Sequence, residues 1–93
     1  TAILIHEKER RTSIKTRYIA GGQQMMRTDD ETVAPIRNET KQKIIKLVTS
    51  GLNNCNALVI ADYAKGVLTP KITKQLIRLA KKAKIPIIKD YIY

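Results

Sequence analysis

The chain has 93 residues, a net charge of +10 and 43% apolar residues, with four tyrosines and neither Phe nor Trp. This length suits one small domain, and an apolar content near the globular average excludes wholesale disorder. The one cysteine, Cys55, excludes an internal disulfide framework, and no apolar run approaches the roughly 20 residues that span a bilayer.

The first half of the chain predicts β structure. Residues 2–6 ("AILIH") read as a short strand, and residues 12–20 ("TSIKTRYIA") alternate as expected for a half-buried strand with a basic face. Gly21-Gly22 is a turn dipeptide, and "QQMMRT" after it reads as another strand. We therefore expect a β-hairpin over residues 12–31.

The second half predicts an α/β arrangement. Asn38 is expected to cap a helix whose apolar face comprises Ile44, Leu47, Val48 and Leu52. The apolar run 57–61 ("ALVIA") is typical of a strand buried on both faces, and 85–88 ("IPII") of a second buried strand. Thr69-Pro70 between them is a helix start. Residues 57–90 thus form a βαβ unit, whose crossover we expect to be right-handed.

Polar residues follow both predicted parallel strands. In open α/β sheets, ligands bind beyond the carboxyl ends of the strands, where Asp62 and Asp90 are expected. Lys65 lies in the loop after the first of these strands and could meet a phosphate or a hydroxyl group. The alternative is that such a loop acid caps the next helix or forms a structural ion pair.

The predicted hairpin offers a second candidate site. Lys15 and Arg17 lie two residues apart on one strand, so both could reach the same anion. The alternative is that they belong to a solvated strand face.

The positive charge would also suit a nucleic-acid partner. However, the basic residues are scattered, with adjacent pairs only at 10–11 and 81–82, and no aromatic residues are interleaved with them. We therefore do not expect nucleic acid as the partner. A small basic module that binds nucleic acid or an acidic partner remains the alternative function.

Two blocks of the chain resemble a known family. "TSIKTRYIAGGQQMMRTDDE" (12–31) and "NALVIADYAKGVLTPKITKQLIRLAKKAKIPIIKD" (56–90) are similar, in the same order, to stretches of bacterial heptose 7-phosphate kinases. Those are ribokinase-like (PfkB-type) carbohydrate kinases and form the first domain of the bifunctional ADP-heptose synthesis protein. The chain departs from their pattern at Lys89, where an apolar residue is usual, and at Tyr91-Ile92-Tyr93, where the family continues "PKG" after the aspartate.

The resemblance implies that residues 1–93 are a single incomplete domain, the central part of a cytoplasmic kinase that makes ADP-heptose for lipopolysaccharide. It implies that Lys15, Arg17, Asp62, Lys65 and Asp90 bind the sugar phosphate. The family's anion hole, catalytic base and nucleotide site would follow residue 93, so we expect no catalytic residue and no bound cofactor in this chain. ATP and Mg²⁺ would act in the full-length enzyme. The expected partners are a sugar phosphate and a complementing kinase fragment, and no membrane.

Overall fold

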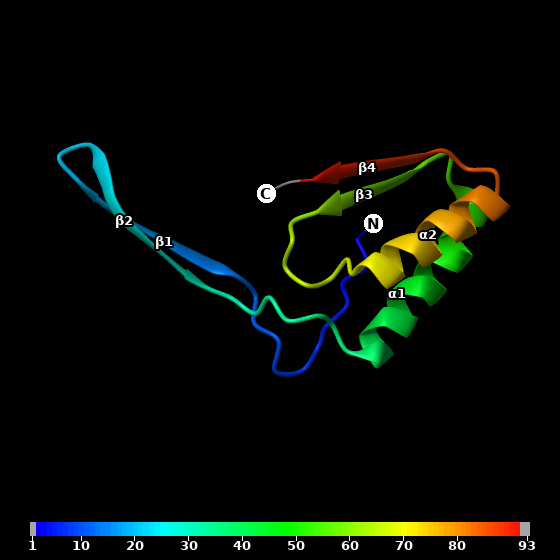
Figure 1. Cartoon of the computed structure of the whole chain (residues 1–93), viewed down its shortest axis with the longest axis horizontal. Helices are drawn as coiled ribbons and strands as arrows, with labels where there is room; N and C mark the ends of the chain where they lie inside the picture. The colour runs from blue at the N-terminus through cyan, green and yellow to red at the C-terminus, as the bar shows by residue number, and fades with distance from the viewer. Residues whose placement is uncertain (1, 92–93) are drawn as a thin grey trace.

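The computed structural model describes residues 2–91, which form two separate two-stranded sheets and two main helices (Figure 1). In chain order these are β1 (Ile14–Ala20), β2 (Gln23–Asp30), α1 (Asn38–Gly51), a 3₁₀ turn (Leu52–Asn54), β3 (Leu58–Asp62), α2 (Pro70–Lys82) and β4 (Ile87–Tyr91). The predicted hairpin, helix and βαβ unit are confirmed as elements, so the chain is α/β. The right hand of the crossover and the ribokinase-like assignment stay predictions.

The βαβ unit begins and ends where its local chemistry dictates. β3 and β4 are parallel, with a register that runs from Leu58 opposite Ile87 to Asp62 opposite Tyr91. Pro70 is the first residue of α2, and the Thr69 hydroxyl accepts a hydrogen bond from the backbone N–H of Ile72 at 3.3 Å. The predicted cap is therefore confirmed, and the loop 63–69 is held between a strand end and a capped helix.

Both helices lie on the same face of the parallel pair. Ile60, Ile72 and Leu76 form the buried core, and Ile36, Val48, Leu58, Leu68 and Ile87 pack against it. The opposite face has no covering layer among residues 2–91, since Val59 is 63% exposed and Ile88 is 58% exposed. The expectation that these strands are buried on both faces is therefore wrong. An apolar run shows what a strand can bury, but not that a second layer covers it.

The β1–β2 hairpin stands away from the helices and the parallel strands (Figure 1). Gly21 and Gly22 have φ values of +58° and +77°, which a two-residue turn of type I′ requires. All residues of both strands are exposed, so the predicted half-buried strand is wrong about burial. The radius of gyration is 16.5 Å, against roughly 12 Å for a compact domain of this length.

The N-terminal segment also differs from the expectation. Residues 2–7 have no secondary structure, because β1 pairs with β2 and β3 with β4, and neither sheet takes residues 2–6 as a further strand. Ile3 and Leu4 are 69% and 91% exposed. The predicted strand is therefore wrong: an apolar run forms a strand only where another strand pairs with it.

Within residues 2–91, neither α1 nor α2 has the length and hydropathy needed to cross a bilayer.

Candidate functional site

Asp62 is the last residue of β3 and is buried, with 7% of its surface exposed. Its Oδ1 accepts a hydrogen bond from the backbone N–H of Ala64 at 2.9 Å, which turns the chain sharply after the strand. Its Oδ2 lies 3.8 Å from the Nζ of Lys89, on the neighbouring strand. The buried carboxylate thus has both a turn hydrogen bond and an ion pair. It does not cap α2, because Thr69 does.

Lys65 lies three residues further along the same loop and is half-buried. Its Nζ donates to Oε1 of Glu31 at 2.7 Å, which connects this loop to the base of the hairpin. A hollow of about 160 Å³ is lined by Asp62 and Lys65 together with Ala61, Tyr63, Val67 and Leu68. The structure therefore brings together two of the predicted site residues around one small cavity.

Glu31 is ionised more readily than an ordinary glutamate. The hydrogen bond from Lys65 is the main reason that the pKa of Glu31 lies below 4.5, and Ser13 and the charge of Lys15 act in the same direction. Partial burial opposes them by penalising the charged form. Glu31 is therefore held in its charged form, and an anion that approaches Lys65 competes with Glu31.

Gly66 lies in the loop 63–69 after β3, called the site loop below. It allows this loop to contact the segment before α1 directly. Its φ is +86°, and a Cβ at this position would overlap the backbone carbonyl oxygens of Val33 and Ala34. Its own carbonyl accepts from the backbone N–H of Ile36 at 3.0 Å. The glycine is needed for close approach to the chain's own backbone.

Arg10, from the N-terminal segment, contacts both the site loop and the segment before α1. Its guanidinium donates to the carbonyl oxygens of Ala34 at 2.7 Å, of Thr32 at 3.4 Å, and of Lys65. Five donors in a planar fork allow one side chain to satisfy several carbonyls at once. Arg10 therefore ties together the N-terminal segment, the segment before α1 and the site loop.

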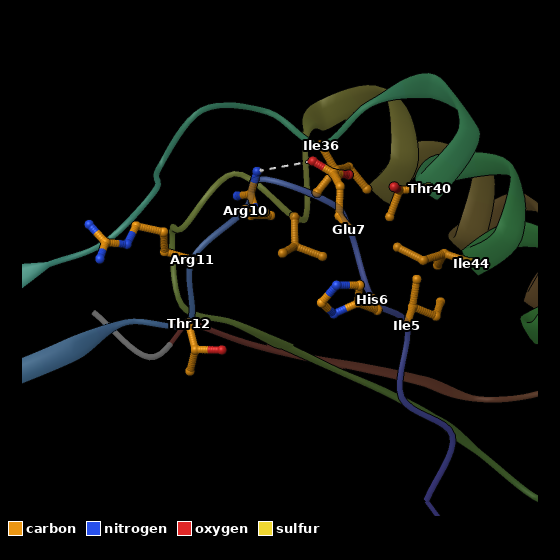
Figure 2. A pocket seen from close by; sticks show the side chains of 10 residues that line it. Ile5, His6, Glu7, Arg10, Arg11, Thr12, Ile36, Thr40 and Ile44 are labelled. Carbon is orange, nitrogen blue, oxygen red and sulfur yellow. Dashed lines mark ion pairs between the residues drawn. The ribbon is translucent and has the colours of Figure 1, made fainter.

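A second hollow, of about 290 Å³, lies beside Arg10 between the N-terminal segment and α1 (Figure 2). Glu7 lines this hollow, and its Oε1 lies 3.8 Å from Nη1 of Arg10. Its Oε2 accepts a hydrogen bond from the backbone N–H of Arg37 at 3.1 Å. A hydrogen bond with the Thr40 side chain is the largest cause of the lowered pKa of Glu7; burial opposes it, and the contacts with Arg37 and Arg10 add to it. The polar groups here bind one another, so we assign this hollow a structural role.

Glu7 also explains an error in the predicted helix start. The residue that caps α1 is Arg37 and makes no side-chain capping bond, while Asn38 is already helical. The carboxylate of Glu7, 30 residues earlier in the sequence, accepts the Arg37 N–H instead. A favourable electrostatic partner for a helix N-terminus can come from a distant segment, which local sequence rules do not detect.

Lys15 and Arg17 share one face of the hairpin. The Nζ of Lys15 lies 3.6 Å from Oδ2 of Asp29, and Arg27 pairs with the same oxygen at 3.3 Å. Arg17 lies opposite Arg27 in the strand register. Lys15 is near enough to Glu31 to affect its pKa, so it belongs to the periphery of the Lys65 cluster. Arg17 lies two residues nearer the Gly21-Gly22 turn than Lys15 does.

Asp90 lies opposite Ala61 in the parallel register. It therefore shares the uncovered face of the sheet with Val59 and Ile88, whereas Asp62 lies on the face towards the helices. Asp90 is exposed. The structure places Asp62 and Asp90 at the same end of the sheet but on opposite faces.

Three residues that contact Asp62, Lys65 or their loop were not predicted as part of the site: Lys89, Glu31 and Arg10. Lys89 contacts Asp62 because alternation along β4 places it on the same face, a consequence of register that a single strand does not reveal. Glu31 lies inside the family-like block 12–31, so that resemblance contained a signal for it. Nothing in the local sequence identifies Arg10 as the residue that holds the loop.

The resemblance implies Mg²⁺ and ATP for the full-length enzyme, but the described residues contain no cluster of metal ligands, and the loop after β3 is not a nucleotide-binding loop. Among residues 2–91 no group of three or more His, Cys, Asp or Glu side chains could hold a metal ion. The loop after β3 has one glycine and no glycine-rich phosphate-binding sequence. No step of a reaction is therefore assigned to either group in this chain.

Together these features define part of an α/β domain with a charged cluster at the carboxyl end of its parallel strands. The chain is 39% identical over 87 residues to bifunctional protein HldE of Hyphomonas neptunium, in an alignment that covers 94% of the chain and 18% of that protein. It is 40% identical over 84 residues to the Rhodospirillum rubrum protein of the same name, and 38% over 90 residues to that of Aliarcobacter butzleri.

These alignments cover 90–97% of the chain but only 17–19% of each relative. The chain is therefore homologous to one segment of bifunctional protein HldE, and the resemblance found in the sequence is confirmed. No protein-family model and no solved structure matches the chain.

Proposed function

We propose that the chain is a segment of a ribokinase-like sugar kinase, which phosphorylates D-glycero-D-manno-heptose 7-phosphate in ADP-heptose and lipopolysaccharide core biosynthesis. The observation that carries the proposal is the 38–40% identity to bifunctional protein HldE over at least nine-tenths of the chain. The kinase-like blocks 12–31 and 56–90 both lie in this chain, and the charged cluster joins them through Glu31 and Lys65. A cytoplasmic location follows from this proposed role.

In this proposal Lys65 and Asp62 form the inner part of the sugar-phosphate site. An ammonium group stabilises a phosphate by charge, and a carboxylate accepts hydrogen bonds from sugar hydroxyls. Asp62 is already oriented by Ala64 and Lys89, so its position does not depend on the ligand. Lys65 is held by Glu31 at 2.7 Å and would exchange that partner for the phosphate.

Lys15 and Arg17 would supply further positive charge from the hairpin, and Asp90 would contribute from the uncovered sheet face. Arg17 and Asp90 do not line the Asp62–Lys65 hollow. Their participation therefore requires that the sugar phosphate extend along the hairpin and around the sheet edge.

We propose further that this chain alone does not turn over substrate. Phosphoryl transfer depends on positioning ATP, metal and acceptor in line, with charge stabilisation around the transferred group. The chain spans less than a fifth of its curated relatives, and its described residues contain neither a cluster of metal ligands nor, after β3, a glycine-rich phosphate-binding loop. A complementing kinase fragment would have to supply those parts.

The proposal is tested by titrating the isotope-labelled chain with heptose 7-phosphate and following its amide resonances. The expected result is a saturable shift confined to the loop 62–66 and the hairpin base, weakened in Lys65→Gln but not in the matched exposed variant Lys46→Gln. ADP release with ATP present should stay at background. Absence of shifts in the loop, or equal weakening in both variants, would overturn the proposed sugar-phosphate site. Turnover by the isolated chain would overturn the proposal that it is inactive alone.

A further inference from the structure

The acidic and basic residues of this chain are segregated. Between Glu39 and Asp90, Asp62 is the sole acidic residue in the sequence, and it is buried beside Lys89. The two helices lie side by side on one face of the sheet (Figure 1). Their sequences carry several lysines and one arginine, most of them exposed. Apart from Glu39 in the first turn of α1, no carboxylate of the two helices compensates this positive charge.

Four of these cations converge on one hollow between the helices. The hollow has a volume of about 340 Å³ and is lined by Lys41 from α1 and by Lys71, Lys74, Gln75 and Arg78 from α2. The spacing of Lys71, Lys74 and Arg78 is i, i+3 and i+7, which places them on one side of α2. None of the four cations forms an ion pair with any of residues 2–91.

The packing of α2 fixes this arrangement. Ile72, Leu76 and Ala80 are buried against the sheet and set the rotation of the helix about its axis. On α1, Lys41 directly follows Thr40, which is 8% exposed. The cations therefore stay close together although like charges three and four residues apart repel one another. An anion bound in the hollow would relieve this repulsion.

We propose that the hollow of Lys41, Lys71, Lys74 and Arg78 binds a compact anion that carries several adjacent phosphates. Cations from two helices can each contact a different phosphate group of such an anion. A single phosphate is too small to contact all of them at once. The volume fits a small ligand. A nucleic-acid strand is less well matched, because Tyr18, Tyr63 and Tyr91 lie elsewhere and provide no stacking surface beside the hollow.

This site is separate from the proposed sugar-phosphate site. It shares no residue with Lys15, Arg17, Asp62, Lys65 or Asp90. Loss of one site by substitution should therefore leave the other intact, and failure of either proposal would not decide the other.

The test is calorimetric titration of the 93-residue chain with inorganic tripolyphosphate and, separately, with orthophosphate. We expect saturable binding near 1:1, with tripolyphosphate bound at least about tenfold more tightly than orthophosphate because several charge-assisted contacts form together. The variant Lys71→Gln/Lys74→Gln should weaken tripolyphosphate binding about tenfold or more. Glutamine has nearly the helix propensity of lysine, so both helices should persist in far-UV circular dichroism.

The matched control is Lys43→Gln/Lys46→Gln, which removes the same charge from α1 at positions outside the hollow. It should weaken binding by less than about threefold, because dissolved salt screens the attraction between exposed lysines and an anion that they do not contact. Equal weakening by the two double variants would overturn the proposal in favour of non-specific attraction. Equal affinity for the two phosphates, or binding of duplex DNA that tripolyphosphate does not displace, would also overturn it.

Discussion

Gly66→Ala is the substitution that most directly tests how the site loop is held. Its methyl group would overlap the carbonyl oxygens of Val33 and Ala34, and its φ of +86° disfavours any residue with a Cβ. The left-handed conformation alone costs a non-glycine residue roughly 1–2 kcal/mol. Relief of the overlap must then move the backbone and strain the hydrogen bond from Ile36 N–H to the Gly66 carbonyl, which costs about another 0.5–1.5 kcal/mol.

The expected decrease in the free energy of unfolding is therefore roughly 1.5–3.5 kcal/mol. That is a large fraction of the stability of a small domain, which is typically about 5–15 kcal/mol in total. The measurement is urea unfolding followed by far-UV circular dichroism, and the midpoint should fall at an unchanged slope.

Two other glycines serve as matched controls. Gly21 has a φ of +58° but an open space around its missing Cβ, so Gly21→Ala carries the conformational cost without the overlap. Gly51 is helical with open space, so Gly51→Ala should stabilise the protein by about 0.5–1 kcal/mol. The reasoning is refuted if Gly66→Ala proves no more destabilising than Gly21→Ala.

Three further predictions concern the core, the carboxylates and the loop. Ile72→Ala, at a side chain only 1% exposed, should destabilise by about 2–5 kcal/mol, and an unchanged urea midpoint would contradict the assigned core. Because the pKa values of Glu7 and Glu31 are lowered below 4.5 in the folded chain, the unfolded chain takes up protons first as the pH falls below that value. Stability should thus decrease on acidification from neutral to below 4.5 and further until the folded-state pKa values are passed; urea midpoints that stay level or rise would show the sign to be wrong. Arg10→Met removes three hydrogen bonds to carbonyls while keeping an apolar stem. It should speed hydrogen exchange in the loop 63–66 and lower stability by about 1–3 kcal/mol, whereas an unaltered exchange profile would exclude the proposed role.

The sequence predicted elements whose signals are local. Thr69-Pro70 begins α2 because both residues act within one turn, and Gly21-Gly22 forms the hairpin turn because of its own backbone freedom. Burial was predicted less well, since the apolar run around Val59 does not reveal that one face of the sheet is uncovered. Whether residues 2–6 form a strand likewise depends on a partner strand.

The candidate site shows the same division. The sequence predicts that Asp62 and Lys65 lie near one another because both follow a predicted strand, and the structure places them around one hollow. Lys89 and Glu31, which pair with them, lie 27 and 34 residues away in the sequence and follow only from strand register and hairpin placement. The sequence places Asp90 at the correct end of the sheet. Only the strand register, with Asp90 opposite Ala61, shows that it lies on the other face from Asp62.

We propose that this chain can replace the corresponding segment of a heptose 7-phosphate kinase. The most direct test replaces the aligned 84-residue segment of the Rhodospirillum rubrum protein, to which the chain is 40% identical, by the corresponding residues of this chain. ATP-dependent phosphorylation of heptose 7-phosphate is then measured, with Lys65→Gln and Lys46→Gln introduced separately into the hybrid. We expect the hybrid to be active, Lys65→Gln to raise KM for the sugar phosphate, and Lys46→Gln to leave it unchanged. A folded hybrid without activity, or one in which both variants behave alike, would contradict this proposal.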